Sequence, residues 1–130
     1  MAVDPRGADL KRLVAEEDGQ PIVMLNLLRF GSGGVERYAE YLRHFRPFAE
    51  RVGGQIIYYG LGQPALVAET EQQWDAVLLV RYPNRTAFST MVRDPDYQRG
   101  THLRTEALVK AVLQPTLEAM NTVWPDGTHT

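Results

Sequence analysis

Side chains that could form an active site stand at four positions of this 130-residue chain: Asn26, Tyr97, His102 and Arg104. Asn26 is the single polar residue in the apolar run 22–28. A buried amide without a hydrogen-bond partner costs about 1 to 3 kcal/mol, so this side chain must have one. The partner is either a carbonyl or hydroxyl oxygen of a ligand in a pocket, or a backbone or helix group across the core.

The other three candidates lie close together near the end of the chain. Arg104 follows Tyr97 by seven positions, a spacing that places both side chains on one helical face. The guanidinium would stabilise a carboxylate or enolate oxygen, or form a salt bridge with Glu106, Asp96 or another subunit. His102, predicted to face the pocket, or Tyr97 would move the proton.

Aromatic rings on two neighbouring predicted strands form the candidate ligand-binding set: Tyr58, Tyr59, Trp74 and Tyr82. Such rings would line an apolar pocket, where a phenol can donate a hydrogen bond to a developing oxyanion. Cross-strand packing or a dimer interface explains the same rings. His44, which precedes Phe45, is predicted to lie on the solvent side of its helix.

Composition argues against several classes of function. The chain has 14 Lys and Arg against 16 Asp and Glu, a net charge of -2, so we expect neither nucleic acid nor a membrane as partner. There is no cysteine, which removes thiolate metal sites, iron–sulfur clusters and thiol nucleophiles. No two histidines have metal-ligand spacing, so we predict no metal. The glycine-rich loops 31–34 and 60–62 lack nucleotide-binding signatures, so we predict no cofactor. The sequence favours a cytoplasmic protein.

The elements that must position these residues follow from the apolar pattern. Helices are expected from Asp4 and Pro5, over 35–52, from Arg85 and again from Pro95; strands are expected over 22–30, 55–59, 65–69, 74–82 and 108–114. The second helix has an apolar stripe that consists of Val35, Tyr38, Leu42, Phe45, Ala49 and Val52. Pro47 lies inside it and is expected to kink or restart the helix.

A lead-in helix followed by β-α-β-β-α-β is the ferredoxin-like plan, an α+β fold with an antiparallel sheet and helices on one face. We divide the chain into a helical lead-in over 1–20, one α+β domain over 21–116 and a tail over 117–130. A sheet covered on one face only leaves its other face apolar, which predicts a homodimer.

Five segments resemble the domain-of-unknown-function 1330 family. They are Met-Leu-Asn-Leu at 24–27, the glycine pair at 53–54 before a tyrosine-rich strand, Trp-Asp-Ala-Val at 74–77, Tyr-Pro at 82–83 and Asp-Pro-Asp-Tyr-Gln at 94–98. The resemblance implies a dimeric α+β barrel, with two sheets face to face and a pocket between sheet and helices in each subunit. Related monooxygenases, isomerases and cyclases differ too much for one activity to be carried over.

Two functions from different classes stay open. The first is a cofactor-independent enzyme that performs proton transfer, isomerisation or monooxygenation on a small oxygenated apolar molecule. Asn26 would orient the substrate oxygen, Arg104 would stabilise negative charge, and His102 or Tyr97 would transfer a proton. The second is a non-catalytic dimer that binds a small molecule or serves as a structural module, which the lack of a strong acid–base pair or nucleophile favours.

Overall fold

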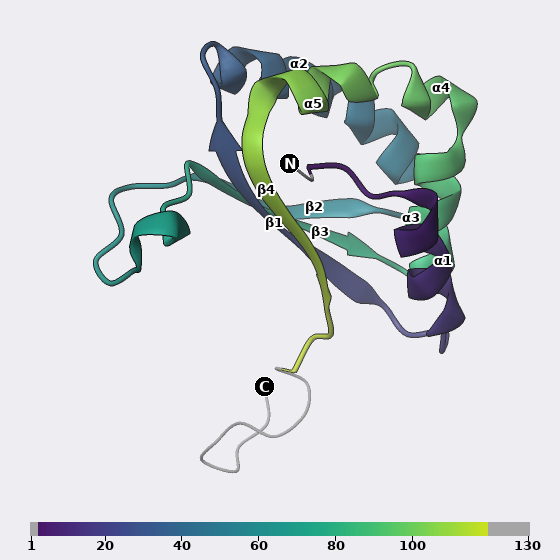
Figure 1. The fold of residues 1–130 in the computed structure, drawn as a ribbon. Coiled ribbons are helices and arrows are strands. Elements are labelled where there is room, and N and C mark those ends of the chain that lie inside the picture. The colour runs from purple at the N-terminus through teal and green to yellow at the C-terminus, as the bar shows by residue number, and fades with distance from the viewer. Residues whose placement is uncertain (1–2, 120–130) are drawn as a thin grey trace.

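A computed structural model describes residues 3–119 as one layer of strands under a layer of helices (Figure 1). The strands are β1 (Ile22–Phe30), β2 (Gln55–Leu61), β3 (Ala76–Tyr82) and β4 (Leu108–Thr116). The helices are α1 (Gly7–Ala15), α2 (Gly34–Arg51), α3 (Arg85–Arg93), α4 (Pro95–Gln98) and α5 (Thr101–Ala107), with a 3₁₀ turn η1 (Thr70–Gln72).

The sheet is antiparallel with strand order β2-β3-β1-β4, which confirms the ferredoxin-like prediction. Alternate side chains of the two central strands are buried under the helices: Ile22, Met24, Asn26, Leu28, Ala76, Leu78, Val80 and Tyr82. This period-two pattern marks one face of each strand as the core face. Asn26 is thus the polar residue in a core row of the central strand.

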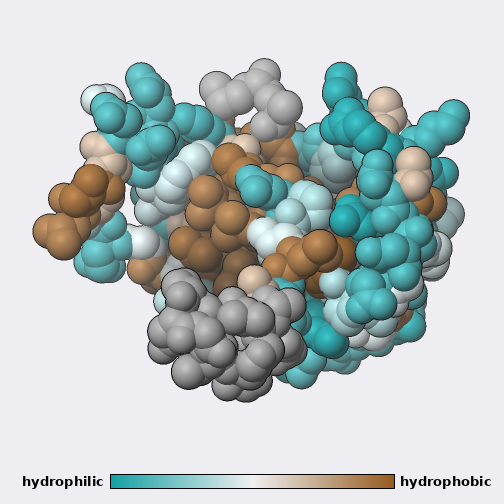
Figure 2. All heavy atoms as spheres, turned by 90° about the horizontal axis from the view of Figure 1, so that it is seen from below, coloured by the Kyte–Doolittle hydropathy of each residue, from teal (hydrophilic) through white to brown (hydrophobic). Residues whose placement is uncertain are grey.

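The opposite face of the sheet, here called the outer face, is also apolar. Its half-buried aliphatic side chains, which alternate with the core residues along β1, β3 and β4, are Leu25, Leu27, Val77, Leu79 and Val112. Figure 2, which views the molecule from below, shows hydrophobic side chains gathered over the middle of this side. An apolar area of this kind on a folded domain commonly marks an interface.

Helix α2 differs from its predicted stripe. Its buried residues include Tyr38, Tyr41 and Phe45, whereas Val35 is 46% exposed. The prediction therefore omitted Tyr41, which lies between the other two rings on the core face. The helix also runs unbroken through Pro47 to Arg51, so the expected restart there is wrong.

The segment 65–69, predicted as a strand, is irregular and exposed. It belongs to a loop that projects from the sheet between β2 and β3, drawn in teal in Figure 1. Leu66 is 99% and Val67 91% exposed, so no neighbouring strand covers them. The apolar composition that suggested a strand here therefore has no partner within the described chain, and β3 pairs instead with residues 55–61.

The helix starts predicted at Arg85 and at Pro95 are confirmed. Asn84 accepts a hydrogen bond from the Ala87 N–H at 2.8 Å, and Asp94 accepts one from the Asp96 N–H at 2.8 Å. At the amino terminus Arg6, not Asp4, is the cap of α1, because the Asp4 side chain points elsewhere. Most of the predicted tail, from residue 120 on, lies outside the described residues.

Glu17 ties the segment after α1 to the start of α3. Its Oε1 accepts hydrogen bonds from the N–H and the hydroxyl of Thr86, at 2.8 and 2.7 Å, and its Oε2 accepts one from the Gly19 N–H. The hydrogen bonds from Thr86 lower the pKa of the carboxyl to about 2. Because the folded state lowers this pKa, the stabilisation is complete above the ordinary glutamate pKa and is lost as the pH falls toward 2.

We therefore expect Glu17→Gln to lower the melting temperature at pH 7, because the wild-type carboxyl is ionised there and the variant lacks its charge. The difference in melting temperature between variant and wild type should shrink below about pH 4.3 and close near pH 2. Thermal melts at several pH values measure this. Glu40→Gln is the control, because the Glu40 side chain is exposed and makes no hydrogen bond or ion pair with residues 3–119. A gap that does not depend on pH would contradict the assignment.

Candidate functional site

A cavity of about 230 Å³ lies between the core face of the sheet and helices α2 to α5. About half of its wall is apolar, and includes Met24, Phe45, Leu78, Val80, Phe88 and Met91. Polar side chains of the wall are Asp4, Asn26, Tyr38, Tyr41, Tyr82, Tyr97 and Arg104, along with Gln98 and Thr101. The cavity therefore combines apolar surface with several hydrogen-bonding groups, both of which small-molecule sites use.

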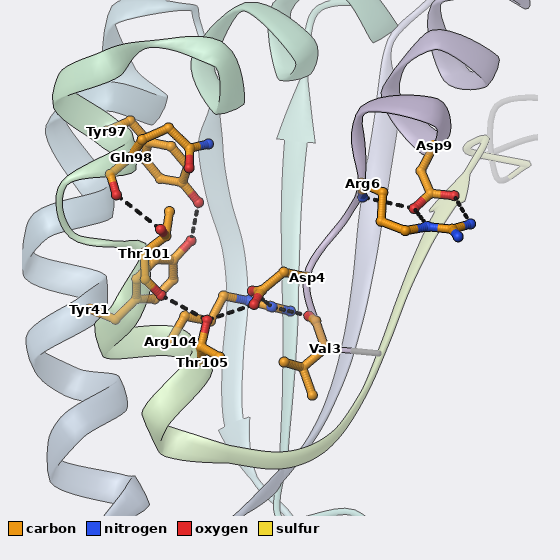
Figure 3. A network of polar contacts seen from close by, with 10 residues as sticks. All are labelled: Val3, Asp4, Arg6, Asp9, Tyr41, Tyr97, Gln98, Thr101, Arg104 and Thr105. Atoms are coloured by element: carbon orange, nitrogen blue, oxygen red, sulfur yellow. Dashed lines mark hydrogen bonds and ion pairs between the residues drawn. The ribbon is translucent and has the colours of Figure 1, made fainter. Parts of the chain in front are cut away.

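Arg104 is the charged centre of this cavity and is 5% exposed. Its Nη1 forms an ion pair with Asp4 Oδ1 at 2.6 Å and donates a hydrogen bond to the Val3 carbonyl, as Figure 3 shows. The amino-terminal segment thus supplies the ion-pair partner of Arg104, rather than the expected Glu106 or Asp96. Its Nη2 is buried and has no hydrogen-bond partner among the described residues.

The two acidic residues that were expected to pair with Arg104 are engaged elsewhere. Glu106 accepts a hydrogen bond from Arg37 at 2.8 Å, and Asp96 pairs with Arg99 at 3.0 Å. Both pairs lie at the surface, where ion pairs contribute little. The Arg104 head group is therefore left to the cavity and to Asp4.

Three tyrosines surround the guanidinium. The Tyr41 and Tyr97 hydroxyls lie 2.6 Å apart, so one donates a hydrogen bond to the other, whereas the buried Tyr38 hydroxyl has no partner within residues 3–119. Burial raises the pKa of all three phenols, and the nearby Arg104 charge offsets this only in part. The phenols are therefore neutral at pH 7 and act as hydrogen-bond donors and acceptors.

Asn26 has backbone partners within the sheet and also lines the cavity. Its Nδ2 donates weak hydrogen bonds to the carbonyls of Met24 and Leu78, at 3.4 and 3.3 Å, on its own strand and on the neighbouring β3. The same side chain also lines the cavity, and the described residues give its Oδ1 no donor. That oxygen is available to accept a hydrogen bond from a ligand.

Tyr97 and Arg104 meet in the cavity although they do not share a helix. Helix α4 ends at Gln98 and α5 begins at Thr101, with Gly100 between them. A side chain at Gly100 would collide with the His44 ring, so the small residue permits the close approach of α2. The two side chains were predicted to meet, but through a single helix that the chain does not form.

The histidines lie where the sequence did not place them. His102 is exposed and does not line the cavity, so it faces solvent rather than the predicted pocket. His44 is half-buried instead of solvated: its ring stacks on Tyr97 and its Nε2 donates a hydrogen bond to the Tyr97 carbonyl at 2.8 Å. His44 therefore supports Tyr97 from behind.

Of the four aromatic residues predicted to bind a ligand, only Tyr82 lines the cavity. Tyr59 is partly exposed and packs near Tyr38, with ring centroids 6.2 Å apart. Tyr58 lies on the outer face, paired with Leu79. Trp74 lies between the cations of Arg29 and Lys110, 5.8 and 5.3 Å from its ring, at the base of the projecting loop.

Sequence reasoning missed three groups of the cavity. Tyr38 was placed in the core stripe without a polar role, and Tyr41 was omitted, although its position three residues after Tyr38 puts it on the same helical face. Asp4 was considered only as the start of a helix. Its contact with Arg104 joins residues 100 positions apart, for which the local pattern carries no signal.

Residues 3–119 contain no group of three His, Asp or Glu side chains arranged to hold a metal ion. In the same range no helix is both long and apolar enough to cross a lipid bilayer.

Comparisons with known proteins agree with this architecture. A family model described as "Domain of unknown function (DUF1330)" matches residues 33–114. A structure of a protein of unknown function from Rhodopseudomonas palustris is 31% identical, with a TM-score of 0.78 over 88% of this chain and 96% of that chain. No curated protein matches the chain.

More distant structures share the fold alone. A dimeric ferredoxin-like protein of unknown function from Jannaschia sp. CCS1 is 14% identical, with a TM-score of 0.58 over 75% of this chain and 99% of that chain. A hydroxynitrile lyase from Passiflora edulis is 10% identical, with a TM-score of 0.61 over 83% of this chain and 100% of that chain. At such identities no activity carries over.

Proposed function

We propose that this chain, which belongs to the DUF1330 family, binds a small apolar molecule through a carbonyl or enol oxygen in the cavity around Arg104. The observation that carries the proposal is a pair of buried groups that lie beside each other and make no hydrogen bond of good geometry within residues 3–119, Arg104 Nη2 and the Tyr38 hydroxyl. Each unmade hydrogen bond costs about 1 to 3 kcal/mol, and a ligand oxygen that accepts from both would recover it.

The charges around the cavity restrict the ligand further. Asp4 already balances the positive charge of Arg104, so a second full carboxylate would leave the buried site with excess negative charge. A neutral carbonyl, or an enol that shares its proton with the phenols, avoids this excess. Asn26 Oδ1 would accept a hydrogen bond from a hydroxyl elsewhere on the same molecule.

In this proposal the protein is a homodimer in which the outer faces of two sheets pack together. The apolar row that includes Leu25, Leu27 and Val77 supports this assembly, as does the description of the Jannaschia protein as dimeric. A cytoplasmic location, which the lack of cysteine favours, stays a prediction.

Isomerisation by proton transfer is the second candidate, favoured because a carboxylate, a cation and phenols share one cavity. The Asp4 carboxylate would take a proton from the carbon next to the ligand carbonyl, while Arg104 and Tyr38 stabilise the enolate oxygen. The same proton, returned to a different carbon, would complete the reaction, so no oxidant or cofactor is consumed. The exposed His102 has no part in this scheme.

Tyr38→Phe tests the binding site, because it removes only a hydroxyl that makes no hydrogen bond of good geometry with residues 3–119. We expect the free variant to be more stable by about 1 kcal/mol, since a buried unsatisfied group disappears. Its affinity for a binding lactone, quinol or β-dicarbonyl compound should fall about five- to tenfold, because the hydrogen bond to the ligand is lost. Chemical denaturation and calorimetry measure the two effects.

Tyr59→Phe is the matched control, since its hydroxyl lies outside the cavity and should affect neither measurement. Unchanged affinity in Tyr38→Phe would contradict the proposed site. The failure of every tested lactone, quinol and β-dicarbonyl compound to bind the wild type would contradict it as well.

The catalytic candidate is tested with unsaturated lactones in D₂O, followed by NMR. Asp4→Asn should abolish isomerisation there while ligand binding persists.

A further inference from the structure

A second cavity, of about 430 Å³, lies between α1, α3 and the end of β4. In Figure 1 helix α1 lies beside α3 at one end of the sheet. The apolar part of its wall is large and includes Leu10, Leu13, Phe88, Ala111, Leu113 and Pro115. The two cavities adjoin, since Asp4, Pro5, Met24, Phe88 and Leu113 line both of them.

Arg85 is the cation of this second cavity that lacks an ion pair. Its Nε is buried and finds no hydrogen-bond acceptor among residues 3–119, and no carboxylate of that range lies within salt-bridge distance of its head group. Arg12, the other cation of the wall, is already paired with Asp9 at 3.0 Å. Arg85 thus has a buried N–H without an acceptor in the described chain, and a charge without an ion-pair partner there, beside an apolar space.

The acidic side chains of the wall do not balance the charge of Arg85. Asp9 is held by Arg6 and Arg12, and Asp4 by Arg104. Glu16 is exposed and makes no ion pair with a described residue. These carboxylates would repel a doubly charged phosphate more strongly than a single carboxylate, so the wall favours a monoanion at Arg85.

We infer that the second cavity is a binding site for an amphipathic monocarboxylate, such as a medium-chain fatty acid. The carboxylate accepts hydrogen bonds from the Arg85 guanidinium, including the Nε–H that has no other acceptor, and the alkyl chain packs against the apolar wall. This site adjoins the one that surrounds Arg104 but has a different charged centre, Arg85, and it does not depend on the function proposed there.

Octanoate is the probe, with octanol as its uncharged counterpart, and calorimetry measures both. Octanoate should bind the wild type at least tenfold more tightly than octanol, because only the anion pairs with Arg85. Arg85→Gln should weaken octanoate at least tenfold, whereas Arg12→Gln, which removes a cation of the same wall that is already paired, should change it less than twofold. Equal loss in the two variants would overturn the inference.

A second pair of variants tests the apolar part of the site. Ala111→Met adds side-chain volume inside the second cavity and should weaken octanoate about tenfold, whereas Ala8→Met adds the same atoms on the exposed side of α1 and should not. Tyr38→Phe, which alters the first cavity, should leave octanoate affinity unchanged. Octanoate that fails to bind, while carbonyl ligands still bind at Arg104, would overturn this inference and leave the proposed function standing.

Discussion

Replacing Leu27 with Glu is expected to turn the proposed homodimer into a monomer at micromolar concentration. Leu27 lies on the central strand, on the outer face, between Val77 of β3 and Val112 of β4. In a dimer whose sheets pack face to face, Leu27 of both subunits is buried in the interface. Two carboxylates without partners would then lie in an apolar interface, where each is strongly disfavoured.

We expect the dimer dissociation constant to rise at least a hundredfold, which corresponds to about 2.8 kcal/mol. Light scattering during size exclusion, over a range of concentrations, measures the mass directly. Val35→Glu is the control: it places the same charge at an exposed aliphatic residue of α2, away from the outer face, and should leave the mass unchanged. A wild type with the monomer mass would refute the assembly itself.

Much of the fold could be predicted because its signals are local. Asn84 and Asp94 stand just before helices and accept hydrogen bonds from the backbone there, so each cap is visible in a few residues of sequence. The apolar residues 65–69 carried a local strand signal as well, but a strand needs a neighbour to pair with. Leu66 and Val67 have none in the described chain, so composition alone was misleading there.

The candidate site was harder to predict because its contacts are long-range. Asn26 could be found, since a lone amide in an apolar strand must be satisfied. Tyr97 and Arg104 both line the cavity, but the single helical face that their spacing predicted is broken at Gly100. The role of Asp4 could not be seen, because an ion pair between distant segments leaves no periodicity in either one.

Replacing Asp4 with Ala is expected to lower the free energy of unfolding by about 2 kcal/mol. The variant leaves the buried Arg104 guanidinium without its carboxylate and removes the hydrogen bond that the Thr105 hydroxyl donates to Asp4 at 2.6 Å. Breaking a fully buried pair in this way costs about 3 to 5 kcal/mol. The Asp4 side chain is 37% exposed, so water solvates part of the site and the expected loss is smaller.

The two partners of this ion pair should respond unequally. Arg104→Met replaces the buried cation with an apolar chain and leaves an Asp4 that reaches water, so we expect a smaller loss, about 1 kcal/mol. The double variant should then resemble Arg104→Met, with a coupling energy of about 1 to 2 kcal/mol in a double-mutant cycle. Urea unfolding of the four proteins measures it. Losses that simply add would mean that Asp4 stabilises the chain through contacts other than Arg104.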